Sequence, residues 1–196
     1  SWIVEFCEKL LKKTYKIGWF VILYPFSIPT DTEKILKLMK RAGCDSLSFG
    51  LQSAHPEILK NVRRKASEPE RLMKILKIAN EVGFVTHVSY IFGLPGETLE
   101  TIKTTIDYSL KCPATLAQFF KLIPFNGTCL AEQYPDGKIC ELKDDELWDM
   151  TRVAFRKFYM RPKKILNIAR LTTRNPAWYF KIFTNIPSIL RHVGLS

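Results

Sequence analysis

Hydrophobic and polar positions in the first 125 residues alternate between the period of a strand and the period of a helix. Short apolar, β-branched and aromatic runs predict strands at residues 17–23, 46–51, 84–92 and 116–123. The intervals between them repeat apolar residues at i, i+3, i+4 and i+7, which is typical of an amphipathic helix. These helices are expected to begin near Thr30, Ser67 and Thr98 and to end near Gly43, Gly83 and Leu110.

Strands separated by amphipathic helices indicate βαβ units and a parallel sheet. An amphipathic helix is already under way at Trp2, so the pattern suits part of a (β/α) barrel. A small, complete open α/β sheet has the same periodicity, and the pattern alone favours neither. Beyond Asp144 the pattern is purely helical, and prolines divide it into helices expected at residues 144–159, 162–171 and 176–191.

Charge separates a balanced body from a basic tail. All 19 acidic residues lie within residues 1–150, together with 20 of the 30 Lys and Arg residues. Residues 151–196 hold the other ten Lys and Arg and no acid. Such a tail, interleaved with aromatic residues, is one feature of proteins that bind nucleic acids or membrane surfaces.

The cysteines and the chain ends limit the class of protein further. The five cysteines are odd in number and none are spaced CxxC, which argues against a disulfide framework and favours reduced, buried or half-buried thiols in the cytosol. No apolar run reaches the length of a transmembrane helix, and the N-terminal segment lacks the features of a secretory signal. Since no initiator Met is present, we expect the chain to be truncated.

The most informative motif is YIFGLPGET at residues 90–98. An apolar strand runs into a turn in which Gly93 and Gly96 permit unusual dihedrals and close approach of the backbone to a ligand. Glu97 and Thr98 follow at the start of the next helix, where free N–H groups favour oxygen-rich ligands and Thr98 can cap the helix. On its own, the motif is more readily explained as a structural turn.

Two further motifs lie where strands are expected to end. DSLSFGLQSAH at residues 45–55 places Gln52 and Ser53 at the carboxyl end of a strand, the edge at which α/β folds bind ligands. Ser53 as a helix cap or turn residue is the structural alternative. LIPFNGT at residues 122–128 is another strand that breaks into a turn. The basic cluster at residues 63–65 is interpreted as a solvated loop, with contact to a carboxylate near the ligand edge as the alternative.

These motifs together resemble the radical S-adenosylmethionine (SAM) superfamily, and within it the branch that carries a cobalamin-binding domain. The resemblance covers about residues 1–130 and rests on several motifs in the family's order and spacing: GCDSLSFGLQS at 43–53, EILK at 57–60, Gly83, IFGLPGET at 91–98 and PFNGT at 124–128. RKFYMRP at 156–162 also resembles that branch's helical extension. The resemblance implies an α/β fold: the C-terminal portion of a partial TIM-like (β/α) barrel over residues 1–135, with parallel strands, followed by a basic α-helical extension over residues 136–196.

The family's activity and cofactors follow from the same resemblance. Such enzymes use a [4Fe–4S] cluster to cleave SAM reductively to a 5′-deoxyadenosyl radical, which abstracts a hydrogen atom from the substrate; the branch adds cobalamin through a further domain. Gln52 and Ser53 are expected to contact the ribose or methionine part of SAM, and the turn at 91–97 and the last strand to contact the adenine. The implied cofactor-binding residues are Gln52, Ser53, Ile91, Gly93, Leu94, Pro95, Gly96, Glu97, Ile123 and Pro124.

The sequence departs from the family at one decisive point. The CxxxCxxC motif that ligates the cluster is absent, so the resemblance assigns this chain no metal ligand, and we expect it neither to hold the cluster nor to turn over by itself. Gln52 stands where many members have Glu, and Asn126 stands where proline is common. Both replacements keep the polarity or the turn chemistry of the position.

The expected partner of the whole enzyme is a small-molecule or lipid-like substrate, and the expected location is the cytoplasm or the membrane periphery. The rival hypothesis is a non-catalytic basic module that binds a membrane surface or, less readily, a nucleic acid through residues 151–196. A solvated basic face that packs on the barrel explains the same residues equally well.

Overall fold

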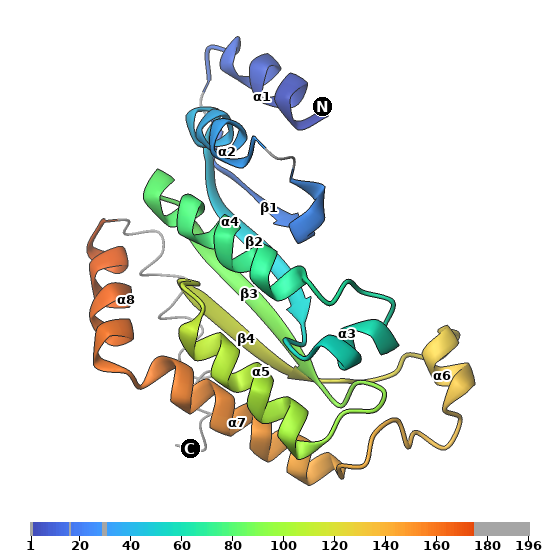
Figure 1. Cartoon of the computed structure of the whole chain (residues 1–196). Helices are drawn as coiled ribbons and strands as arrows, with labels where there is room; N and C mark the ends of the chain where they lie inside the picture. The colour runs from blue at the N-terminus through green and yellow to red at the C-terminus, as the bar shows by residue number, and fades with distance from the viewer. Residues whose placement is uncertain (1, 16, 29–30, 175–196) are drawn as a thin grey trace.

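The computed structural model describes residues 2–15, 17–28 and 31–174 (Figure 1). Its centre is one parallel sheet with the strand order β1-β2-β3-β4, so strands that follow one another in sequence are also neighbours in space. The strands are β1 (Trp19–Leu23), β2 (Cys44–Gln52), β3 (Val85–Phe92) and β4 (Leu116–Lys121). The alternation of strand and helix in the sequence therefore predicted the parallel sheet correctly.

Helices connect and follow the strands. Gly83, at φ 92°, ends the helix before β3, and Thr98 caps the helix after it by accepting the backbone N–H of Thr101, both as the sequence predicted. The helices are α1 (Trp2–Leu11), the 3-10 turn η1 (Pro25–Ser27), α2 (Thr32–Arg41), α3 (Pro56–Asn61), α4 (Glu68–Val82), α5 (Leu99–Lys111), α6 (Cys129–Gln133), α7 (Asp144–Tyr159) and α8 (Pro162–Arg174).

Helices cover one face of the sheet. In Figure 1, α4, α5 and α7 lie against this face, and Leu47, Phe49 and Leu51 of β2 are buried beneath it. On the opposite face, Phe20 and Ile22 of β1 remain 68% and 72% exposed. A doubly wound open sheet places helices on both faces, whereas a (β/α) barrel places them on one. One-sided cover with a sequential strand order identifies the fold as a portion of a (β/α) barrel.

The helical extension packs on the sheet as far as the structure describes it. Phe158 of α7 is buried in the core against Phe119 of β4. The hydroxyl of Tyr159 donates to the Ala117 carbonyl at 2.7 Å and accepts the Ala117 N–H at 3.0 Å. The side chain of Tyr159 thereby satisfies the backbone at the edge of β4, where a further strand would otherwise pair.

Differences from the expected elements are small. The bounds of α7 agree with the prediction, α8 continues past residue 171 to Arg174, and strand ends differ by up to two residues. The short helices α3 and α6 were not predicted. Thr30 and the helix expected at residues 176–191 lie outside the described residues.

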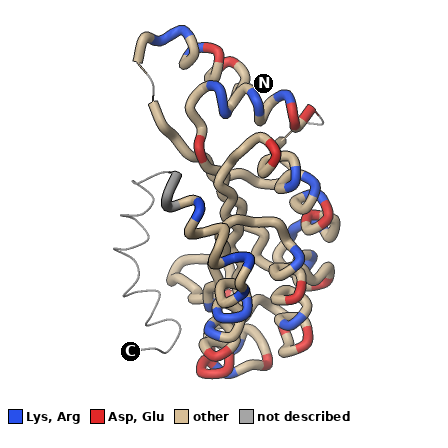
Figure 2. Tube along the Cα trace, turned by 90° about the vertical axis from the view of Figure 1, so that its left-hand side faces the viewer, with Lys and Arg blue, Asp and Glu red and all other residues tan. Residues whose placement is uncertain are grey.

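The described surface mixes both signs of charge. Figure 2 shows Lys and Arg interspersed with Asp and Glu along the helices. Of the tail's cations, Arg161 donates to the Leu110 carbonyl, and Lys164 donates to the Ala114 carbonyl at 2.5 Å. Burial lowers the pKa of Lys164 to about 8. Among residues 2–174 as described, no helix combines the length and the apolar character needed to cross a membrane.

Candidate functional site

The ends of β2, β3 and β4 place all ten predicted residues at one edge of the sheet. Because the three strands are parallel and each is hydrogen-bonded to its neighbour, the loops that follow Gln52, Phe92 and Lys121 leave the sheet on the same side. This carboxyl edge is where α/β folds bind ligands. The topology therefore places these residues at a common edge, and their contact with a ligand stays a prediction.

At the end of β2, the chain adopts a conformation that non-glycine residues rarely take. Gln52 has φ 72°, and the pairing of β2 with β3 shifts register between Gly50 and Gln52. Ser53 is fully buried, lies 3.1 Å from the Thr105 hydroxyl and accepts the His55 N–H at 3.1 Å. The Ser53 hydroxyl is thus engaged within the protein and fastens the loop to α5.

In the turn after β3, the side chain of Glu97 is hydrogen-bonded to the backbone of the same turn. The buried Glu97 carboxylate accepts the N–H groups of Gly93 at 2.6 Å and Leu94 at 3.0 Å. Its second oxygen, Oε1, is buried and has no hydrogen-bond partner. Burial raises the pKa of Glu97 to about 7, although the two N–H groups act in the opposite direction. Because the Gly93 N–H donates to Glu97, the Gly93 carbonyl is the backbone group left to contact a ligand.

Gly96 is required by the packing of the turn, whether or not a ligand approaches it. The backbone of Gly96 has φ 78°, and a Cβ there would lie 2.7 Å from Nδ2 of Asn61. Asn61 donates through the same atom to the Pro95 carbonyl at 2.8 Å. Asn61, at the end of α3, was missed by sequence reasoning because α3 itself was not expected.

An apolar groove of about 520 Å³ lies beside the turn, between the ends of β3 and β4. It unites three of the predicted residues, Ile91, Ile123 and Pro124, and its lining is completed by Phe120, Lys121, Leu122, Phe125, Thr128 and Leu130. Gln52, Ser53 and the turn at residues 93–97 lie outside this lining. A flat ring with little charge, such as adenine, fits a groove of this chemistry.

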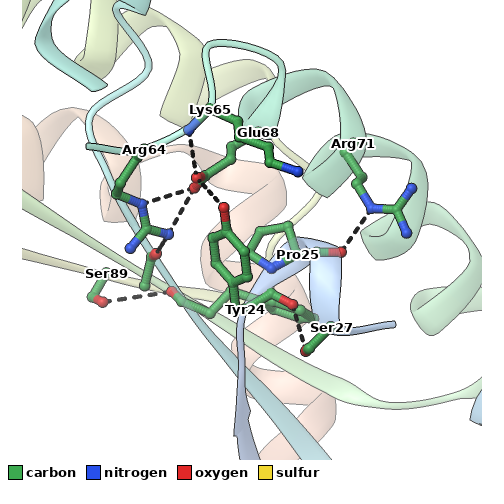
Figure 3. Close-up of polar contacts among 10 residues, drawn as sticks. Tyr24, Pro25, Ser27, Arg64, Lys65, Glu68, Arg71 and Ser89 are labelled. Carbon is green, nitrogen blue, oxygen red and sulfur yellow. Dashed lines mark hydrogen bonds and ion pairs between the residues drawn. The ribbon is translucent and has the colours of Figure 1, made fainter. Parts of the chain in front are cut away.

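A buried ion pair stands behind the end of β2 (Figure 3). Arg64 donates through Nε and a terminal nitrogen to Oε2 of Glu68, at 2.9 and 2.7 Å, and also to the Gly50 carbonyl at 2.6 Å. Tyr24 donates its hydroxyl to Oε1 of the fully buried Glu68 at 2.7 Å. The interpretation of residues 63–65 as a solvated loop is therefore wrong for Arg64. Arg64 lies in the loop before α4, so no helical spacing indicated its pairing with Glu68.

The histidines and cysteines of the described chain are not part of the groove lining, in which Lys121 is the titratable side chain. His87 lies on the open face of β3, with Nδ1 2.8 Å from the Ser48 hydroxyl, and burial lowers its pKa while the nearby Gln118 amide opposes the shift. Within the described residues, no three His, Cys, Asp or Glu side chains gather as a metal site. Cys7, Cys44 and Cys112 are buried as free thiols, whereas Cys129 is exposed.

Comparison with known proteins agrees with this arrangement. The sequence matches the family described as the Radical SAM superfamily over residues 2–109. It is 31% identical over 157 residues to an uncharacterised methyltransferase of Pyrococcus horikoshii, covering 71% of this chain and 34% of that protein. It is 25% identical over 182 residues to the anaerobic magnesium-protoporphyrin IX monomethyl ester cyclase of Rubrivivax gelatinosus, covering 93% of this chain and 31% of that protein.

The fold is shared with a solved enzyme. The structure of the radical SAM methyltransferase TsrM from Kitasatospora setae, with cobalamin and a [4Fe–4S] cluster bound, superposes with a TM-score of 0.56 at 23% identity, covering 66% of this chain and 27% of that chain. The chain thus spans about a third of the length of the curated relatives it matches. The family match covers more than half of the sequence, and on that ground the chain belongs to the radical SAM superfamily.

Proposed function

We propose that this chain is the part of a radical SAM enzyme that receives the adenosyl portion of SAM. The observation that carries the proposal is the carboxyl edge of the sheet, where Ile91, Ile123 and Pro124 line one apolar groove beside the glycine turn. When SAM is bound to a reduced cluster, its cleavage supplies a 5′-deoxyadenosyl radical that abstracts hydrogen from the substrate. The residues of this chain bind and orient SAM for that chemistry.

Each part of the edge has a proposed role. The groove takes the adenine ring and excludes water from its faces. Gln52 presents an amide, with both donor and acceptor atoms, to the ribose hydroxyls or the methionine carboxylate. The turn at residues 93–97 is held rigid by Glu97 and directs the backbone after Ile91 toward the adenine.

The cluster does not fit the residues of this chain. Its family ligands are three cysteines spaced CxxxCxxC, whereas the five cysteines here lie far apart in sequence, and Cys7, Cys44 and Cys112 are buried in the hydrophobic core. We propose that the cluster ligands, and any cobalamin domain, belong to a longer protein of which this chain is a piece.

The proposed partner of the longer protein is a small-molecule substrate, and methyl transfer and ring closure are the two reaction types suggested by the relatives' names. A lipid-like substrate, contact of the basic tail with a membrane surface and a cytoplasmic or membrane-peripheral location are finer proposals. Against the rival of a basic binding module, Arg161 and Lys164 are occupied by backbone carbonyls of the sheet domain. A salt titration of binding to anionic liposomes and to RNA tests that rival.

The experiment compares this chain with the longer protein under anaerobic reconstitution with iron and sulfide. The chain alone is expected to give no stable visible absorption of a [4Fe–4S] cluster. The longer protein is expected to form the cluster and, on reduction with dithionite, to convert SAM to 5′-deoxyadenosine. A stoichiometric cluster on this chain, or no 5′-deoxyadenosine from the cluster-loaded longer protein, overturns the proposal.

A matched pair of variants tests the groove. Ile123 is 55% exposed and lines the groove, whereas Ile165 is 57% exposed on α8. Ile123→Asp is expected to raise the KM for SAM at least about tenfold, because a charged group would replace an apolar contact to the ring. Ile165→Asp is expected to leave it unchanged. Equal effects of the two variants would place the adenine elsewhere.

A further inference from the structure

Among the described residues other than glycine, two have a left-handed backbone. They lie close to the two ends of the hydrogen bond between Arg64 and the Gly50 carbonyl, called the Arg64–Gly50 link below. Gln52 has φ 72° and Arg63 has φ 58°. Gln52 follows two residues after Gly50, and Arg63 immediately precedes Arg64, which donates to the Gly50 carbonyl at 2.6 Å. Such conformations are unfavourable for non-glycine residues and persist where the surrounding contacts enforce them, often at functional sites.

The link itself is rigid. Both carboxylate oxygens of Glu68 are satisfied: Oε2 accepts two N–H groups from Arg64, and Oε1 accepts the Tyr24 hydroxyl and the Lys65 N–H, the latter at 3.0 Å. The guanidinium group also lies 5.0 Å from the centre of the Tyr24 ring. Figure 3 shows these groups converging from the end of β1 and the start of α4 behind β2. These contacts restrain the position of Arg64, and Arg64 in turn restrains the Gly50 carbonyl.

The chain on the other side of Gln52 is fastened as well. The Ala54 N–H donates to the Thr105 hydroxyl at 3.1 Å, and the buried Ser53 hydroxyl lies 3.1 Å from the same atom. Gln52 thus sits between two anchors, one through Arg64 to α4 and one through Thr105 to α5. Its left-handed backbone therefore lies between two segments that are each hydrogen-bonded to a helix or to the loop before it.

We propose that Arg64 and Glu68 are positioning residues that hold the end of β2 so that Gln52 presents its amide at the SAM site. They act through the hydrogen bond from Arg64 to the Gly50 carbonyl. This inference rests on the proposed function for the role of Gln52, while the mechanical link stands on the contacts alone. The two are tested separately.

Arg71 supplies the matched control. Like Arg64, it donates to backbone carbonyls, those of Pro25 at 2.8 Å and Ile28 at 2.5 Å, and it lies over an aromatic ring, that of Phe26. Its hydrogen bonds go to Pro25 and Ile28 and not to the Gly50 carbonyl (Figure 3). A lysine at either position keeps the charge but loses the planar fork that makes several bonds at once.

The first measurement follows backbone amide exchange at residues 50–54 in this chain, without SAM. Arg64→Lys is expected to speed exchange there at least about tenfold, since the anchor at Gly50 is lost. Arg71→Lys is expected to leave that segment unchanged while speeding amide exchange at residues 26–28. Unchanged exchange at residues 50–54 in Arg64→Lys, or equal acceleration in both variants, overturns the mechanical link.

The second measurement uses the cluster-loaded longer protein and the formation of 5′-deoxyadenosine from SAM. Arg64→Lys is expected to raise the KM for SAM about tenfold with little change in kcat at saturating SAM, whereas Arg71→Lys changes neither. A loss that scales with thermal stability in both variants, or no change in Arg64→Lys, overturns the positioning role. Absence of any SAM cleavage by the wild-type protein would instead refute the proposed function and leave the exchange result to stand.

Discussion

At the scale of single residues, Glu97 carries the clearest dependence on pH. Burial raises its pKa from about 4.5 to about 7, so the folded state binds a proton that the unfolded state releases between these values. The contribution of Glu97 to stability is therefore fully present below pH 4.5 and is lost as the pH rises through about 7. The free energy of unfolding should fall by up to about 3 kcal/mol over this window.

Glu97→Gln should remove this dependence, because the amide oxygen can still accept the two N–H groups but cannot ionise. Urea denaturation between pH 4.5 and 8 measures the difference between the two proteins. Glu100→Gln, an exposed carboxyl on the next helical turn, should keep the slope of the wild type. If the free energy of unfolding depended on pH equally in wild type and Glu97→Gln, Glu97 would not be the cause of the pH dependence.

Gly96 and Gly127 separate backbone strain from side-chain packing. Both have a left-handed backbone, at φ 78° and 82°, but a Cβ meets Asn61 at Gly96 and nothing within 4 Å at Gly127. Gly127→Ala should destabilise by about 1 kcal/mol from strain alone. Gly96→Ala should lose about 1 kcal/mol more, because Asn61 must leave the Pro95 carbonyl.

Thermal or urea unfolding in an Asn61→Ala background provides the control for Gly96. There the extra loss should vanish, and the two glycine substitutions should become equivalent. If the gap between them persists without the Asn61 side chain, the contact with Asn61 is not its cause.

Residue roles could be predicted from sequence where the cause is local. Thr98 caps its helix by accepting the N–H of a residue three positions later, and Gly83 ends its helix by adopting a left-handed backbone. Both causes lie within a few residues in sequence. Arg64 was misread because its partner at the other end, the Gly50 carbonyl, is 14 residues away in sequence. Ser53 was placed at the correct edge, but the direction of its hydroxyl depends on Thr105 in a later helix. The ligand contacts of the site residues remain predictions.

At the scale of elements, periodicity predicted the long helices and the strands but not the short connections. α7 has 16 residues, enough for several repeats of its apolar face, whereas α6 has five. A helix of one turn carries no readable period. α3 is held by the burial of Ile58 and Leu59, and α6 is capped by the Thr128 side chain.

Tyr159 of α7 has a role that periodicity could not indicate. Its hydroxyl bonds the backbone N–H and C=O of Ala117 in β4. Tyr159→Phe should destabilise the protein by about 1–3 kcal/mol, because the N–H and C=O of the buried Ala117 lose their partner. Chemical denaturation measures the loss. Tyr15→Phe, at an exposed position, is the control and should have almost no effect. Equal stability of Tyr159→Phe and wild type would mean that water replaces the hydroxyl.

At the scale of the whole molecule, the sheet ends differently on its two sides. β4 is covered by α7, whereas β1 pairs with β2 alone among the described strands and exposes Phe20 and Ile22. Periodicity left a half-barrel and a complete open sheet undecided. The order of the strands and the one-sided cover decide between them, because these are properties of the assembled sheet.

We expect the isolated chain to self-associate and to bind a hydrophobic dye, because an uncovered edge strand with apolar side chains is a template for pairing. Size-exclusion chromatography with light scattering, over a range of salt concentrations, measures the association. Ile22→Lys should suppress it by placing a charge beside the edge. A monomeric, dye-silent wild-type chain with a cooperative unfolding transition would show that β1 needs no partner.

The hydroxyl of Tyr159 sets how far such association can go. Growth of a fibril through sheet edges requires two adhesive ends on every subunit, so that each addition exposes a new one. Among the described residues, the Tyr159 hydroxyl pairs with one backbone position on the outer edge of β4, that of Ala117, whereas β1 pairs with β2 alone. If pairing between molecules is confined to β1, two molecules that join there leave no further edge, and the assembly is expected to stop as a dimer. Tyr159 would then limit edge-to-edge growth at Ala117 in addition to stabilising the fold.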